Sequence, residues 1–192
     1  MKANKLPVKI VLTGGPGGGK TTALDLMSRE FPTRATTVIE AATVLYGSGI
    51  PRAKTPESMR AVQLAIYNTQ IALENLQSEL NPGLVLLCDR GTCDGAAYWP
   101  TNGKDFFATL GTTRQEEYHR YDAVLFFETA AAGKLSIQGN NPYRVEDPEQ
   151  AKKIDASLKS VWHDHPEFHF IKHTDSFFNK LQAAMDVIKR WL

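Results

Sequence analysis

The stretch GGPGGGKT at residues 14–21 decides how this sequence folds. It matches the pattern G-x-x-x-x-G-K-[ST], follows the apolar run of residues 8–13, and precedes a helical pattern over residues 20–31. Glycines allow several backbone N–H groups to converge on a phosphate, and the positive end of the following helix faces the same point. The sequence therefore predicts a phosphate-binding loop at the end of the first strand.

The loop chemistry points to a nucleoside triphosphate, expected to be ATP bound with Mg²⁺. Lys20 is predicted to reach the terminal phosphates, and the hydroxyl of Thr21 to ligate the metal. The residues expected to bind the nucleotide form the loop and the first turn of the helix behind it: Gly14, Gly15, Pro16, Gly17, Gly18, Gly19, Lys20, Thr21 and Thr22.

A magnesium site of this kind needs a second, acidic residue at the end of a neighbouring buried strand. Asp89 ends the run LVLLCD and is the first candidate, with Glu128 after residues 123–127 as a weaker rival. Arg90 follows directly, where a cation would lie near the transferred phosphoryl group. The alternative is that Asp89 caps the next helix and Arg90 is exposed.

Glu40 and the long helical segment 56–80 are candidates for an acceptor site. Glu40 is expected to end the second strand, where its carboxylate would orient or deprotonate an acceptor hydroxyl, or would cap the following helix. The long segment carries an apolar stripe and, beside it, a polar stripe that is either solvated or lines the acceptor pocket. The polar stripe consists of Arg60, Gln63, Tyr67, Gln70 and Glu74.

Strand-like runs alternate with helical patterns along the whole chain. The expected strands are 8–13, 37–40, 84–88, 123–127 and 168–171, and the expected helices include 20–31, 56–80, 148–162 and 175–192. Continuous apolar strands separated by helices indicate an α/β fold with a doubly wound parallel sheet, whose ligands bind at the carboxyl ends of the strands. We expect one domain over residues 1–192.

The amino-acid composition limits which classes of partner this protein is expected to bind. Lys and Arg number 22 and Asp and Glu 21, so the net charge is +1, which gives no general attraction to nucleic acid or anionic lipid. The early apolar run is far shorter than a membrane span or a signal peptide requires, and Cys88 and Cys93 are too few for a disulfide scaffold. We therefore expect a cytoplasmic protein that binds small molecules rather than nucleic acid or membrane.

The segment 129–147 is rich in glycine and asparagine and is predicted to be a lid. It contains Arg144, which a closing lid would bring to the transferring phosphoryl group, unless it is an ordinary surface arginine.

Five stretches together resemble the NadR-like AAA-type P-loop family, which includes ribosylnicotinamide kinase domains and the nucleotide-binding domain of translocation-of-TRP-channel proteins. The stretches are TGGPGGGKTT, RAVQLAIYNTQIALE, LLCDRGTCDGAAYWP, RYDAVLFFETAAAG and NNPYRVEDPEQAKKID. The resemblance implies a kinase-like fold with a five-stranded parallel sheet, ATP or GTP at residues 14–21, a metal-site aspartate at Asp89, and Arg144 in a lid. The loop here is richer in glycine than that of the kinase-type members, so the resemblance does not assign nicotinamide riboside as the substrate.

Two functions compete. The favoured one is a small-molecule kinase that transfers the γ-phosphoryl group of ATP to a nucleoside- or nucleotide-like acceptor, with Lys20, Glu40, Asp89, Arg90 and Arg144 as catalytic residues. The alternative is a nucleotide-dependent switch or slow NTPase that acts through a protein partner.

Overall fold

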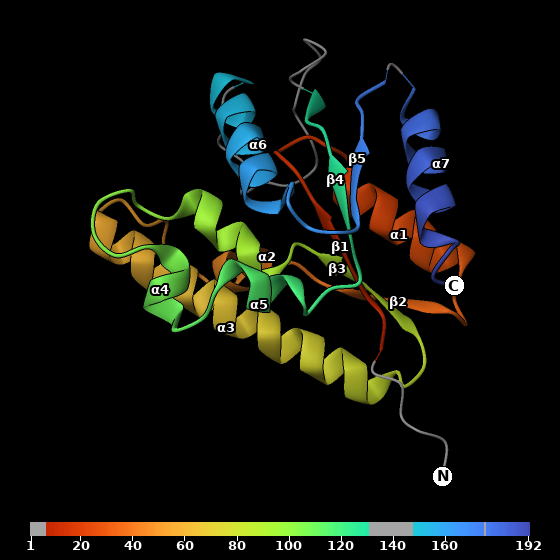
Figure 1. The fold of residues 1–192 in the computed structure, drawn as a ribbon, viewed down its shortest axis with the longest axis horizontal. Helices are drawn as coiled ribbons and strands as arrows, with labels where there is room; N and C mark the ends of the chain where they lie inside the picture. Colours follow the sequence, from red (N-terminus) through yellow and green to blue (C-terminus); the bar gives the residue numbers. More distant parts are fainter. Residues whose placement is uncertain (1–6, 131–147, 175) are drawn as a thin grey trace.

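The computed structural model describes residues 7–130, 148–174 and 176–192. Five parallel strands form one sheet in the order β2-β3-β1-β4-β5 (Figure 1). The strands are β1 (Lys9–Thr13), β2 (Ala35–Val38), β3 (Val85–Asp89), β4 (Ala123–Phe127) and β5 (Phe168–Ile171). Strand β1 pairs with β3 on one side and with β4 on the other, so β1 and its following loop lie in the middle of the sheet.

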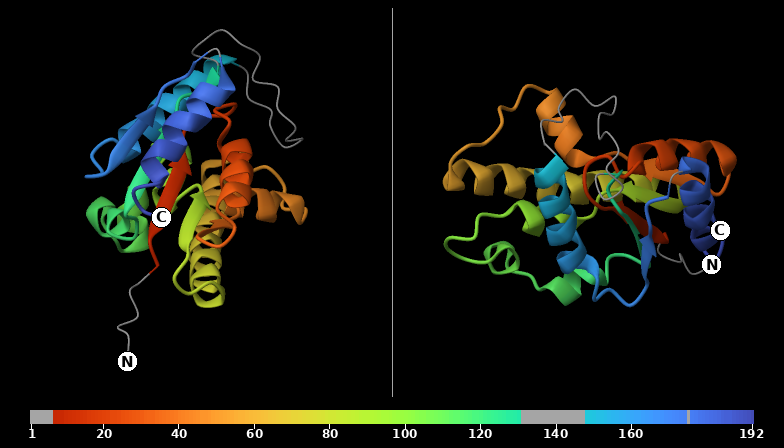
Figure 2. Two further views of the ribbon diagram at one scale, coloured as in Figure 1. Left: turned by 90° about the vertical axis from the view of Figure 1, so that its right-hand side faces the viewer. Right: turned by 90° about the horizontal axis from the view of Figure 1, so that it is seen from above.

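Helices cover both faces of this sheet (Figure 2). The helical elements are α1 (Lys20–Glu30), α2 (Ala41–Gly47), α3 (Pro56–Leu80), the 3₁₀ helix η1 (Thr92–Tyr98), α4 (Phe106–Leu110), α5 (Arg114–Tyr118), α6 (Pro148–Trp162) and α7 (Phe177–Ile188). Successive strand residues point to opposite faces. Ile10 and Leu12 accordingly pack in the core beneath α1 and α7, whereas Val11 packs in the core that includes Trp162 of α6.

The α/β fold class predicted from the sequence is confirmed, with helices on both faces of a five-stranded parallel sheet. The bounds of β4, β5, α3 and α6 agree with the predicted ranges. The second strand differs, because β2 ends at Val38 and Glu40 occupies the N-cap position of α2. The last helix begins at Phe177 and ends at Ile188, inside the predicted range.

The long helix α3 turns its polar stripe inward. Gln63, Gln70 and Glu74 are buried, so the solvated alternative for this stripe is wrong. The apolar stripe is exposed at its C-terminal end, where Leu76 is 51% and Leu80 65% accessible. Leu73 of the same stripe still packs against the core, so the hydrophobic pattern of α3 identifies only part of the face that packs on the protein.

Buried Glu74 explains this orientation. Its carboxylate accepts hydrogen bonds from the ammonium of Lys9 at 3.2 Å, the guanidinium of Arg120 at 3.0 Å and the hydroxyl of Tyr121 at 2.7 Å. A buried charge is tolerated when it is paired and hydrogen-bonded in this way. These partners come from β1 and from the segment before β4, and they hold the polar stripe of α3 against the sheet.

Two predictions fall partly or wholly beyond the part of the chain that the structure describes. Of the predicted lid, residues 131–147 lie outside the described residues, and Arg144 with them.

Among the helices in residues 7–130, 148–174 and 176–192, none combines the length and apolar character that crossing a bilayer requires.

Buried His165 should make stability depend on pH. Its Nε2 lies 3.1 Å from the Tyr121 carbonyl oxygen and its Nδ1 accepts the N–H of Glu167, which suits the neutral ring. Burial lowers the pKa of His165 below its ordinary value of 6.5, so the unfolded chain takes up the proton more readily. The free energy of unfolding should therefore fall as pH drops through 6.5 and should level off below the folded pKa.

Urea unfolding at pH 7, 6 and 5 measures this effect, with His165→Gln as the comparison. The difference in unfolding free energy between wild type and variant should shrink as pH falls. A difference that is the same at all three pH values would show that His165 does not titrate on unfolding.

Candidate nucleotide and acceptor site

The phosphate-binding loop, residues 14–21, connects β1 to α1 and needs glycine for steric reasons. Gly14 has φ 122° and Gly19 has φ 86°, both in the region that side chains rarely adopt. A Cβ at Gly14 would also overlap the carbonyl oxygen of Phe127, because the loop crosses the end of β4 closely. The glycine pattern thus allows the loop to lie against the carboxyl edge of the sheet.

Lys20 begins α1 and folds back over this loop. Its ammonium donates to the carbonyl oxygens of Gly14 and Gly15, each at 2.8 Å, and the residue is only 3% exposed. A cation is thereby held inside the loop at the positive end of a helix, the place where phosphate oxygens bind in loops of this pattern.

Asp89 ends β3 directly beside the first turn of α1. The hydroxyl of Thr21 donates to its Oδ2 at 2.9 Å. Burial raises the pKa of Asp89 to about 6, and the neighbouring charge of Glu40 adds to the rise. A carboxylate and a hydroxyl at this distance form the all-oxygen donor set that Mg²⁺ prefers, so the two residues fit a magnesium site.

The rival candidate, Glu128, lies in a different environment. Its Oε2 accepts the backbone N–H of His173 at 2.8 Å, and its carbonyl oxygen accepts the ammonium of Lys180 at 2.6 Å. These bonds tie Glu128 to His173 after β5 and to Lys180 in α7, whereas Thr21 is bonded to Asp89. The geometry therefore favours Asp89 over Glu128 as the acidic partner of Thr21.

Asp89→Asn should weaken the dependence of ATP binding on Mg²⁺, because a neutral amide is a poorer magnesium ligand than a carboxylate. We expect the ratio of ATP affinities with and without Mg²⁺ to fall by about 10-fold or more. Titration calorimetry at several Mg²⁺ concentrations measures this ratio, and Glu128→Gln is the matched control. Retention of the ratio in Asp89→Asn with its loss in Glu128→Gln would reverse the assignment.

Arg90 has an unusual backbone and a tightly held side chain. Its φ is 79°, the left-handed region that a residue with a Cβ adopts at a cost and that often occurs at functional sites. Its Nη1 donates to the Gly14 carbonyl oxygen at 2.7 Å and to Asp94 Oδ1 at 3.1 Å, while its Nε lies 3.4 Å from Glu40 Oε1. Its Nη2 makes no hydrogen bond to any described residue.

Glu40 does not cap α2 with its side chain, although it occupies the N-cap position. Its carboxylate instead accepts the hydroxyl of Thr43 and faces Arg90. Burial alone would raise the pKa of Glu40, but the charge of Arg90 and the hydroxyl of Thr43 outweigh it and hold the pKa below its ordinary value. Glu40 is therefore ionised at neutral pH.

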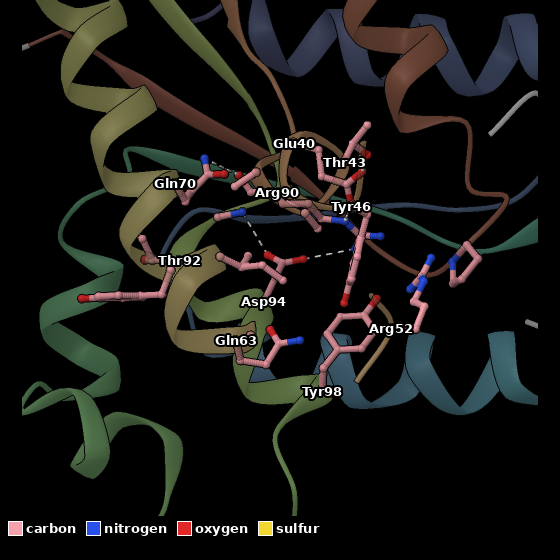
Figure 3. Close-up of a pocket in the computed structure, with 17 residues that line it drawn as sticks. Glu40, Thr43, Tyr46, Arg52, Gln63, Gln70, Arg90, Thr92, Asp94 and Tyr98 are labelled. Carbon is pink, nitrogen blue, oxygen red and sulfur yellow. Dashed lines mark hydrogen bonds and ion pairs between the residues drawn. The ribbon is translucent and has the colours of Figure 1, made fainter. Parts of the chain in front are cut away.

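A pocket opens beside the phosphate-binding loop, with Glu40 and Arg90 in its wall (Figure 3). Pro16 of the loop also contributes, so the pocket is continuous with the predicted nucleotide site. We call this the side pocket, formed by α2, the middle of α3, η1 and nearby loop residues.

Two amides of α3 line the side pocket. Gln70 donates from its Nε2 to Glu74 Oε1 at 3.2 Å and to the Arg90 carbonyl oxygen at 3.3 Å, so both of its N–H groups are used. Gln63 is 9% exposed and forms no hydrogen bond with any residue that the structure describes. Buried amides are normally hydrogen-bonded. The Oε1 of Gln70 and the whole amide of Gln63 are therefore available to a ligand.

Asp94 of η1 was missed by the sequence analysis, although the structure places it at the centre of the site. The only local signal was its position four residues after Arg90, which allows an ion pair on one turn. Its other partners are distant in sequence.

Comparisons with known proteins agree with the fold. A family model described as an AAA domain matches residues 9–177. A structure of deoxyadenosine kinase from M. mycoides with the products dCMP and dCDP bound has a TM-score of 0.63 at 12% identity and covers 95% of this chain and 100% of that one. A second structure of that kinase, with bound dATP, has a TM-score of 0.60 at 12% identity and covers 95% of this chain and 99% of that one. A comparison with curated proteins finds no match.

Proposed function

The chain belongs to the AAA domain family, and from this premise we propose that it is a P-loop kinase that transfers the γ-phosphoryl group of ATP to a nucleoside- or nucleotide-like acceptor. The observation that carries the proposal is the side pocket. It opens beside the phosphate-binding loop and presents a carboxylate, Glu40, and a guanidinium, Arg90, at the junction. A simple NTPase has no need of a partly polar pocket beside the phosphate-binding loop.

In the proposed reaction an acceptor hydroxyl attacks the γ-phosphorus, the bond from the γ-phosphorus to the β–γ bridging oxygen breaks, and ADP leaves. Glu40, ionised at neutral pH, orients the hydroxyl and accepts its proton. Lys20 compensates the charge on the β- and γ-phosphates. Thr21 and Asp89 would hold Mg²⁺, which supplies further charge compensation when bound.

Arg90 is proposed to stabilise the charge of the transferring group. Its Nη1 is bonded to Gly14 and Asp94, whereas its Nη2 has no hydrogen bond among the described residues and offers two N–H groups to a phosphoryl oxygen. Arg144 in the predicted lid remains a sequence-based candidate for a second such arginine.

The two amides support an acceptor with a planar, amide-like edge. Gln63 can both donate and accept, and the Oε1 of Gln70 can accept, which matches a nucleobase or a ring carboxamide that carries adjacent donors and acceptors. A simple polyol lacks such an edge. This is the basis for proposing a nucleoside- or nucleotide-like acceptor rather than a sugar.

The test is ADP release from ATP·Mg²⁺ with a panel of acceptors and with Lys20→Ala as the blank. The panel contains nucleosides, nucleoside monophosphates, ribose and, because of the NadR-like resemblance, nicotinamide riboside. We expect one base-bearing acceptor to raise ADP release well above the rate without acceptor, and ribose to leave it unchanged. ATP binding with no stimulation by any acceptor would favour the nucleotide-dependent switch or slow NTPase.

A further inference from the structure

We propose that Asp94 is a positioning residue for phosphoryl transfer, which acts by holding Arg90 away from Glu40. The inference rests on the proposed function, because it assigns a role within that reaction. It starts from the fact that Arg90 lies between two carboxylates in the wall of the side pocket, Glu40 on one side and Asp94 on the other (Figure 3).

Asp94 is a buried carboxylate with a divided set of partners. Its Oδ2 accepts the N–H of Gly91 at 3.0 Å and the indole N–H of Trp162 at 3.0 Å. Its Oδ1 accepts the hydroxyl of Thr13 at 2.6 Å and Nη1 of Arg90 at 3.1 Å. One oxygen therefore connects η1 to α6, and the other faces the end of β1 and the catalytic arginine.

Arg90 is held by the Gly14 carbonyl oxygen at 2.7 Å and, on its two sides, by a balance between two carboxylates. Asp94 bonds to Nη1 at 3.1 Å, whereas Glu40 is 3.4 Å from Nε, at the long end of hydrogen bonding. If Asp94 loses its charge, Glu40 becomes the sole carboxylate paired with Arg90 among the residues described. The guanidinium is then expected to shift toward Glu40. This shift moves Nη2 away from the transferring phosphoryl group. It also engages the Glu40 carboxylate, which must take the proton from the acceptor hydroxyl.

The variant Asp94→Asn separates these functions of Asp94. Its amide oxygen can still accept from Gly91 and Trp162, which preserves the connection to α6. Its amide N–H₂ then replaces Oδ1, where the Thr13 hydroxyl can rotate to accept but Arg90 cannot. The substitution therefore removes the contact between Asp94 and Arg90 selectively and leaves the bond from Arg90 to Gly14 in place.

Thr13→Val is the matched control. It is nearly isosteric and also removes one hydrogen bond to Asp94 Oδ1, but it leaves the bond to Arg90. A purely structural role for Asp94 predicts similar effects of the two variants on activity. The positioning role predicts that Asp94→Asn lowers kcat about 10- to 100-fold with little change in the KM for ATP, and that Thr13→Val does not.

A double-mutant cycle provides the stricter kinetic test. In an Arg90→Lys background the ammonium cannot bridge Asp94 and Gly14 as the guanidinium does, so Asp94→Asn should then cause less than about twofold further loss of kcat. Equal losses in both backgrounds would show that Asp94 does not act through Arg90 and would overturn the inference.

A measurement without turnover distinguishes this inference from the proposed function. In ¹⁵N spectra of the arginine side chains, with Arg90→Lys used for assignment, wild type should show separate Nη signals for Arg90 because its guanidinium is held in one orientation. Asp94→Asn should shift these signals or merge them, and Thr13→Val should not. Unchanged Arg90 signals in Asp94→Asn would overturn the inference, even if the protein proves to be a kinase. A clear change with no acceptor-dependent turnover in wild type would support the contact and reject the proposed function.

Discussion

Lys20→Ala should abolish acceptor-dependent ADP release, with kcat falling by at least about 10²- to 10³-fold. The ammonium of Lys20 is buried inside the phosphate-binding loop, so no solvent cation replaces it at low cost. Its charge is placed to compensate the negative charge of the β- and γ-phosphates during transfer. The measurement is steady-state ADP release at saturating ATP·Mg²⁺ with the acceptor identified in the panel.

The substitution also removes the hydrogen bonds from Lys20 to the carbonyl oxygens of Gly14 and Gly15. A separate control must therefore show that the variant is still folded. Thermal melting should show that the variant remains folded, and Lys20→Arg should bind ATP more tightly than Lys20→Ala because it keeps the charge. Lys152→Ala on α6 removes an exposed lysine and should leave kcat unchanged. Substantial transfer by a folded Lys20→Ala variant would reject the kinase proposal.

The parts of the fold that the sequence predicted correctly are those with local signals. The phosphate-binding loop combines a contiguous motif with a preceding apolar strand, and β4 is a continuous apolar run buried along its whole length. Helix α3 has the predicted bounds because Thr55 caps its first turn and Pro56 is its first residue. Such signals lie within a few residues and need no knowledge of distant contacts.

The wall of the side pocket depends on distant contacts and was left undecided by the sequence. Helix α3 carries two stripes, and the buried one is polar because Glu74 finds Lys9 and Arg120, which are 65 and 46 residues away. A hydrophobic pattern cannot anticipate such partners, since burial of a charge depends on what is brought against it.

Asp94 and the backbone of Arg90 were hidden for related reasons. Asp94 accepts hydrogen bonds from Thr13, 81 residues away, and from Trp162, 68 residues away. Its residue type alone therefore gave no indication that it lies in the site. The positive φ of Arg90 occurs at a residue that is not glycine and therefore has no compositional signal. The end of β2 was displaced by two residues, which changed Glu40 from the end of a strand to the start of α2.

Glu40→Gln should lower kcat by about 10²- to 10⁴-fold with little change in the KM for ATP. Glutamine has nearly the same shape and can still accept the hydroxyl of Thr43, so the local structure should be preserved. It cannot accept a proton, and it no longer pairs electrostatically with Arg90. Because the pKa of Glu40 is held low, wild type has the charged form at neutral pH and the substitution removes it completely.

A fall in kcat without a change in the KM for ATP would show that Glu40 acts on the acceptor and not on ATP binding. Glu40 bonds to Thr43 and pairs with Arg90 in the wall of the side pocket, so ATP binding should remain within about twofold of wild type. Glu57→Gln at the start of α3 removes an exposed carboxylate and serves as the control that should behave as wild type. A Glu40→Gln variant with normal kcat would mean that the acceptor hydroxyl is activated elsewhere. A variant that lost ATP affinity instead would place Glu40 in the nucleotide site, because a group acting only on the acceptor changes turnover without changing the binding of the donor.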